Sequence, residues 1–184
     1  MNGFTETYEQ IAGHMTHKTS GHTHRAPLPL WAALAAVVDV RNVEHSHVEC
    51  DEQVTTWGVW WLGGGMLAHA QASWGTDAEP LRDLWTFERA IRLLNDHRDH
   101  DPDRGSVATA EARPLRSVVG LCSSDASATF ARMGRDEEAH WTASRELLFS
   151  DGARMPLPRY AGGAAPTSDT AQTLVEAVQQ SMRS

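Results

Sequence analysis

The stretch 54–74, VTTWGVWWLGGGMLAHAQASW, constrains the fold of this chain most strongly. Apolar and small or polar side chains alternate on both sides of three consecutive glycines, and glycine supplies the positive φ angles of tight hairpin turns. The stretch therefore predicts an antiparallel β-hairpin. With Gly63 and Gly64 as a two-residue loop, one face of this hairpin is wholly apolar. That face pairs Trp61 with Met66, Val59 with Ala68 and Trp57 with Ala70.

The opposite face of this hairpin carries polar groups around a glycine. Its members are Thr56, Gly58, Trp60, Leu67, His69, Gln71 and Ser73. Because Gly58 has no side chain, we expect a shallow depression with Trp60 as an aromatic wall and His69 as a titratable group beside it. Such a depression suits a small ligand. The predicted ligand-binding residues are Thr56, Gly58, Trp60, His69 and Gln71.

The rest of the chain predicts an α+β fold. Asp151 and Gly152 indicate a type I′ turn of a second hairpin, in which Leu148 faces Met155. Apolar residues at helical spacing predict helices before Gly13, over 81–94 and over 170–182, and proline and alanine usage favours another over 29–38. Residues 124–134 read as a short helix after a strand that ends at Cys122.

These elements combine into one architecture, an antiparallel β-sheet built from two hairpins and packed by N-terminal, central and C-terminal helices. We expect residues 1–28 to hold the N-terminal helix and a mobile His-rich segment, and residues 29–184 to form a single α+β domain. A hydrophobic content of 41% supports one buried core of this size.

Charge and hydropathy exclude some partners. Asp and Glu number 24 against 16 Lys and Arg, without a clustered basic patch, so nucleic acid is not an expected partner. The longest apolar run is shorter than the roughly 20 residues that span a bilayer, so we expect a cytoplasmic protein without a membrane partner. Lys18 is the sole lysine, a bias that we attribute to a GC-rich bacterial genome. A small molecule or a protein remains as the partner, and a homodimer is left open.

The segment HSHVECDE supports an alternative function. In a strand, His45 and His47 point the same way about 6.6 Å apart and could converge on one ion. With Glu52, the spacing HxH, four residues, then Glu resembles the first motif of the cupin family. The resemblance covers about ten residues, and no second cupin motif follows. It implies a metal-dependent enzyme with one divalent transition metal at His45, His47 and Glu52, whereas the binding function needs no cofactor.

Other residues carry weaker signals. Cys122, placed at a strand-to-helix turn, is a candidate nucleophile with His140 or His69 as its base, although an ordinary thiol is favoured. Three aspartates at 99, 101 and 103 alternate as in a calcium loop, but the following residues fit a solvated loop better. The histidines of the N-terminal segment, His14, His17, His22 and His24, could also collect a metal. The sequence thus favours a binding domain, with an enzyme as the alternative.

Overall fold

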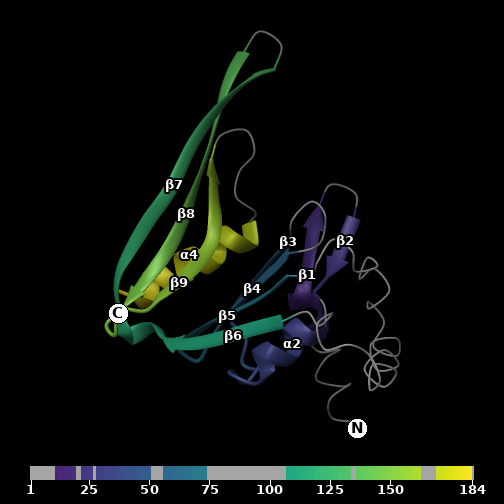
Figure 1. The fold of residues 1–184 in the computed structure, drawn as a ribbon, viewed down its shortest axis with the longest axis vertical. Helices are drawn as coiled ribbons and strands as arrows, with labels where there is room; N and C mark the ends of the chain where they lie inside the picture. Colours follow the sequence, from purple (N-terminus) through teal and green to yellow (C-terminus); the bar gives the residue numbers. More distant parts are fainter. Residues whose placement is uncertain are drawn as a thin grey trace.

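The predicted hairpin forms the centre of a four-stranded antiparallel sheet (Figure 1). In this computed structural model, the described residues are 11–19, 22–26, 28–50, 56–73, 107–133, 136–162 and 169–183. The four strands are β3 (His45–Cys50), β4 (Thr56–Gly63), β5 (Met66–Ser73) and β6 (Val107–Pro114), in that order. β3 and β6 are therefore the edge strands of this sheet.

The hairpin turn differs by one residue from the expected one. Gly64 and Gly65 have φ angles of 58° and 72° and form the loop, whereas Gly63 still pairs with Met66. Gly63 lies against the backbone oxygen of Asn42, where a Cβ would overlap it. The expected pairs are wrong by two residues, which keeps every side chain on its predicted face. The observed pairs are Trp61 with Ala68, Val59 with Ala70 and Trp57 with Ala72.

The face of Trp57 and Trp61 is buried beneath the N-terminal elements. These elements are the 3-10 helix η1 (Ala12–Met15), the ribbon of β1 (Thr16–Thr19) and β2 (His22–Arg25), and α2 (Leu28–Ala35). Leu30 and Leu34, one helical turn apart on α2, are fully buried in the same cluster as both tryptophans. The ribbon lies in the N-terminal His-rich segment, which was expected to be mobile and here forms two paired strands.

The other face of the sheet is covered by α4 (Asp169–Ser181) and by a second, three-stranded antiparallel sheet. That sheet consists of β7 (Val118–Met133), β8 (Asp136–Phe149) and β9 (Arg154–Gly162), and the 3-10 helix η5 (Leu115–Ser117) connects it to β6. In Figure 1, α4 lies between the two sheets. Its buried residues confirm the predicted amphipathic helix over 170–182: Ala171, Leu174, Val175 and Val178.

The second predicted hairpin is present as β8 and β9, but in a separate sheet, so the single sheet built from two hairpins is wrong. Its turn is not type I′, because only Gly152 has a positive φ, of 84°. The Gly152 N–H donates to the Phe149 carbonyl at 2.9 Å, which makes a type I turn followed by a left-handed glycine. The three-residue loop places Met155 opposite Leu147 rather than Leu148.

Residues 124–133 form strand rather than the expected short helix. They continue β7, which pairs with β8 up to Met133 and forms the long arm in Figure 1. A bulge between Ser124 and Ser127 accommodates Asp125, whose φ is 51°. Pairing with β8 therefore overrides the local helix preference of this alanine-rich stretch.

Two α-helices, α2 and α4, are found within the described ranges, so packing by three helices is not supported. The predicted central helix at 81–94 lies outside these ranges, as does most of the predicted N-terminal helix. No helix in the described part of the chain is long and apolar enough to cross a bilayer.

Candidate functional site

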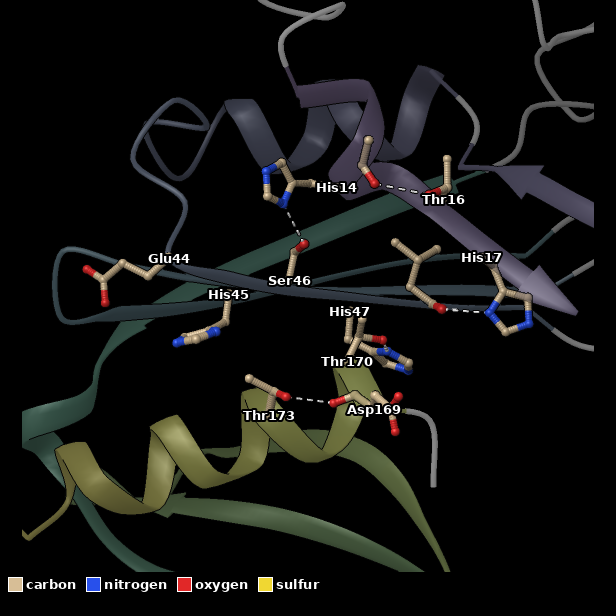
Figure 2. A pocket seen from close by; sticks show the side chains of 12 residues that line it. His14, Thr16, His17, Glu44, His45, Ser46, His47, Asp169, Thr170 and Thr173 are labelled. Carbon is tan, nitrogen blue, oxygen red and sulfur yellow. Dashed lines mark hydrogen bonds between the residues drawn. The ribbon is translucent and has the colours of Figure 1, made fainter. Parts of the chain in front are cut away.

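A pocket of about 530 Å³ lies at edge strand β3, between the N-terminal elements and the start of α4 (Figure 2). Most of its lining residues carry polar or charged side chains. The lining residues are Gly13, His14, Thr16, His17, Glu44, His45, Ser46, His47, Val48, Asp169, Thr170 and Thr173. They come from three segments that are far apart in the sequence, so the pocket exists only in the folded chain.

Strand alternation distributes the β3 side chains over both sides of the pocket. His45 and His47 point toward α4, whereas Ser46 points toward η1 (Figure 2). The Ser46 hydroxyl is 3.1 Å from Nδ1 of His14. On β1, Nδ1 of His17 donates to the Val48 carbonyl at 2.8 Å. These two contacts connect η1 and β1 to the edge strand β3.

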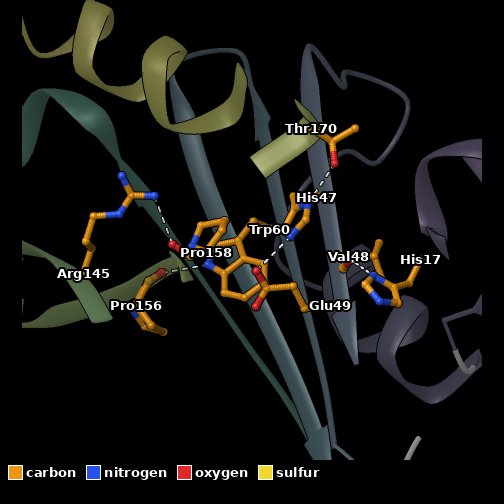
Figure 3. Close-up of polar contacts among 9 residues, drawn as sticks. All are labelled: His17, His47, Val48, Glu49, Trp60, Arg145, Pro156, Pro158 and Thr170. Atoms are coloured by element: carbon orange, nitrogen blue, oxygen red, sulfur yellow. Dashed lines mark hydrogen bonds and ion pairs between the residues drawn. The ribbon is translucent and has the colours of Figure 1, made fainter. Parts of the chain in front are cut away.

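His47 is the best-fixed imidazole of the pocket, with 4% of its surface exposed. Its Nε2 lies 2.9 Å from Oε1 of Glu49, and its Nδ1 lies 2.9 Å from the Thr170 hydroxyl (Figure 3). Because a carboxylate only accepts hydrogen bonds, Nε2 carries the ring proton. In the neutral ring Nδ1 is then an acceptor, and the Thr170 hydroxyl donates to it.

Trp60 separates the two buried histidines of the sheet face. Its ring centre is 5.7 Å from that of His47 and 4.9 Å from that of His69. Its Nε1–H donates to the Pro156 carbonyl of β9 at 2.7 Å (Figure 3). A single row across β3, β4 and β5 therefore carries His47, Trp60 and His69, which the registers place opposite one another.

The depression expected at Gly58 is absent, because the indole of Trp60 fills it. A Cβ built on Gly58 would lie 2.9 Å from the far edge of that ring. Trp60 and His69 are buried at 5% and 6% exposure, whereas Thr56 and Gln71 are exposed. The five predicted ligand-binding residues thus share one face, as the alternation predicts, but they do not line an open hollow.

Gly58→Val should lower the free energy of unfolding by about 1–3 kcal/mol, the usual cost of overpacking a core. The added side chain displaces an indole that its bond to Pro156 and its two histidine neighbours hold in place. Urea unfolding measures the loss. Thr56→Val, on the same face but exposed, is the control and should change stability by less than about 0.5 kcal/mol. Equal stability of the two variants would show that Trp60 does not rest on Gly58.

Burial lowers the pKa of His69 to about 4, against a smaller opposing effect of the Glu49 charge. The folded state therefore takes up this proton only near pH 4, whereas the unfolded chain takes it up near its ordinary value of 6.5. The contribution of neutral His69 to the free energy of unfolding should therefore be complete above pH 6.5. It should fall by on the order of 2–3 kcal/mol as the pH is lowered from 6.5 to 4. Urea unfolding of the wild type and of His69→Gln tests this. A difference between the two that does not change over this pH range would contradict it.

The structure describes two of the three predicted metal ligands, His45 and His47. His45 and His47 point the same way and line the pocket, as their spacing predicts, but Glu52 lies outside the described residues. Among the residues that the structure describes, no three His, Cys, Asp or Glu side chains are placed to hold a metal ion. Both nitrogens of His47 are already hydrogen-bonded.

Cys122 does not stand at a strand-to-helix turn. It lies within β7 opposite Glu146, and β7 continues for eleven residues, to Met133. The basis for a nucleophilic thiol is therefore wrong. Of the four N-terminal histidines, His14 and His17 line the pocket. The side chains of His22, His24 and His140 and the aspartates at 99, 101 and 103 lie outside what the structure describes.

Sequence reasoning missed Glu49, Asp169 and Thr170. The signal for Glu49 was its i+2 spacing from His47, which places both on one side of a strand. Thr170 lies 123 positions from His47, so no local pattern could join the two.

Comparisons with known protein families, with curated proteins and with solved structures found no match to this chain.

Proposed function

We propose that this chain binds a small polar organic molecule in the pocket between β3, α4 and the N-terminal elements. The pocket itself supports this proposal: about 530 Å³, within the range of roughly 300–1,000 Å³ typical of small-molecule sites. Ligand binding was predicted for the face of the central hairpin that carries Trp60. We place it instead on the neighbouring edge strand β3, where His45 and His47 lie on that same face of the sheet.

The groups around the pocket favour a ligand that both donates and accepts hydrogen bonds. Within the described part of the chain, the half-buried His45 imidazole has no hydrogen-bonding partner, so both of its nitrogens can serve a ligand. Glu44 and Asp169 also line the pocket and add carboxylate acceptors, of which Oε1 of Glu44 already accepts from the Gly64 N–H. A small hydroxylated or carbonyl compound would meet these groups better than an apolar one.

Titration of the ¹⁵N-labelled chain with a library of polar fragments tests the proposal. Binders should shift the amide signals of β3 and of the first turn of α4 together. His45→Ala should weaken the best binder about tenfold, because it removes one charge-neutral hydrogen bond worth about 1.5 kcal/mol at most. Glu176→Ala, on the exposed side of α4, should leave binding unchanged. Shifts confined to other elements, or an equal affinity of the two variants, would contradict the proposed pocket.

The metal-dependent enzyme stays a prediction. It would require His47 to exchange a hydrogen bond to Thr170 or Glu49 for a metal bond, and it depends on Glu52. Elemental analysis of the untagged protein distinguishes the two functions. A stoichiometric transition metal that disappears in His45→Ala would favour the enzyme.

A further inference from the structure

We infer that Thr170, His47 and Glu49 form a nucleophile, a general base and its orienting carboxylate, which together cleave small esters in the pocket. This inference rests on the proposed function, since the ester must first enter the same pocket. The observation behind it is a continuous chain of two hydrogen bonds, each 2.9 Å, from a hydroxyl through an imidazole to a carboxylate.

In the neutral imidazole, the two hydrogen bonds place each proton where its role requires it. Glu49 accepts from Nε2 of His47 and so keeps the ring proton there. The lone pair of Nδ1 then faces the Thr170 hydroxyl, at the distance needed for proton transfer. Glu49 does not touch the substrate and is a positioning residue. The chain has the logic of nucleophile, base and orienting group that recurs on unrelated folds.

The imidazole is held in a fixed orientation. His47 is 4% exposed, and the Trp60 ring packs beside it, tilted by 32°. Trp60 is in turn tied to Pro156 of β9. A catalytic base needs such support, because a loosely held imidazole loses the alignment that proton transfer requires.

Thr170, by contrast, is exposed and lines the pocket, so a bound ester can reach its hydroxyl. It is the second residue of α4, a helix of 13 residues. The positive end of the helix dipole therefore lies beside the nucleophile and favours negative charge that develops on an attacked carbonyl oxygen. Access, activation and charge stabilisation thus meet at one side chain.

The reaction proceeds in two balanced steps. First, Oγ of Thr170 bonds to the ester carbonyl carbon while its proton passes to Nδ1 of His47. The bond to the alcohol oxygen breaks, and Nδ1 returns the proton to the departing alcohol. Second, water attacks the acyl-threonine, again with Nδ1 as base, which releases the carboxylic acid and restores the Thr170 hydroxyl. No cofactor or oxidant is needed.

Incubation of the full chain with p-nitrophenyl butyrate tests the inference. Wild-type protein should release p-nitrophenol, and mass spectrometry should find a butyryl group on the peptide that contains Thr170. Thr170→Val, which lacks only the hydroxyl, should lose about 100-fold or more of the rate, whereas Thr170→Ser should retain it. Ser181→Ala, which removes a hydroxyl at the other end of α4, is the control and should match the wild type.

Glu49→Gln tests the positioning role. It keeps the shape of the side chain but removes the charge that fixes the proton on Nε2. The kcat should fall about tenfold or more, whereas the KM for p-nitrophenyl butyrate should stay almost unchanged. A circular dichroism spectrum identical to that of the wild type shows that the variant is folded.

Equal rates in wild type and Thr170→Val, or the absence of a butyryl group on Thr170, would overturn the inference, and Thr170 and His47 would only fasten α4 to β3. Titration with butyrate separates this failure from failure of the binding proposal. If butyrate shifts the β3 and α4 signals but no ester is cleaved, the pocket binds without catalysis. If neither butyrate nor the polar fragments shift these signals and no ester is cleaved, both proposals fail.

Discussion

Gly63→Ala is expected to lower the free energy of unfolding by about 3 kcal/mol or more, since its Cβ would overlap a backbone oxygen. Asn42, which provides that oxygen, belongs to the connection that leads into β3. A backbone group cannot move aside as a side-chain end can, so either β3 or the end of β4 must shift. Urea unfolding of the purified variant measures the loss.

Gly65→Ala is the matched control in the same turn. Nothing lies near its Cβ position, but its φ of 72° makes a side chain unfavourable by about 1–2 kcal/mol. Gly63→Ala should therefore be the more destabilising of the two. The reverse order would show that Gly63 belongs to the loop and Gly65 to the strand.

Trp60→Ala should cost about 3–5 kcal/mol, the range for large-to-small changes in a core. Trp60 packs in one cluster with buried residues of both sheets and of α4, among them Phe149 and Leu174. Its removal also leaves the Pro156 carbonyl without its indole donor. Guanidinium unfolding followed by circular dichroism measures the change.

A second tryptophan provides the control. Trp141 on β8 is 50% exposed, and Trp141→Ala should change stability by about 0.5 kcal/mol or less. If both substitutions cost the same, Trp60 does not join the two sheets. Trp60→Phe should fall between them, because it keeps an aromatic ring but loses the hydrogen bond to Pro156.

The faces of the central hairpin could be predicted from the sequence because side chains alternate strictly along a strand. Trp57 and Trp61 lie on one face and Trp60 on the other, as expected. The exact loop could not be predicted. Three adjacent glycines are locally equivalent, and contacts with other segments select the loop. Gly63 lies against the Asn42 backbone, and the Gly64 N–H donates to Glu44.

The prediction of a depression at Gly58 was wrong for a related reason. Its absence depends on the orientation of the Trp60 indole, which folds back over the glycine two residues earlier on the same strand. Packing against β9 fixes that orientation, and β9 begins almost a hundred residues later, at Arg154. Alternation predicts which face a side chain takes but not where a large ring comes to rest on it.

The candidate site likewise has one part that the sequence predicts and one part that depends on the packing of distant segments. The pair His45 and His47 and their common direction follow from i, i+2 spacing in a strand. The hydroxyl that meets His47 comes from α4, and the local sequence around Thr170 predicts only a helix start. Sites assembled from separate segments become visible once the segments are packed together.

The position of the ring proton on His47 shows directly whether the pocket presents an imidazole that can act as a base toward Thr170. Long-range ¹H–¹⁵N NMR of the side chain reports which ring nitrogen carries the proton. At neutral pH we expect a protonated Nε2 and an unprotonated Nδ1 in the wild type, and a loss of this single tautomer in Glu49→Gln. A proton on Nδ1 in the wild type, with or without one on Nε2, would contradict it.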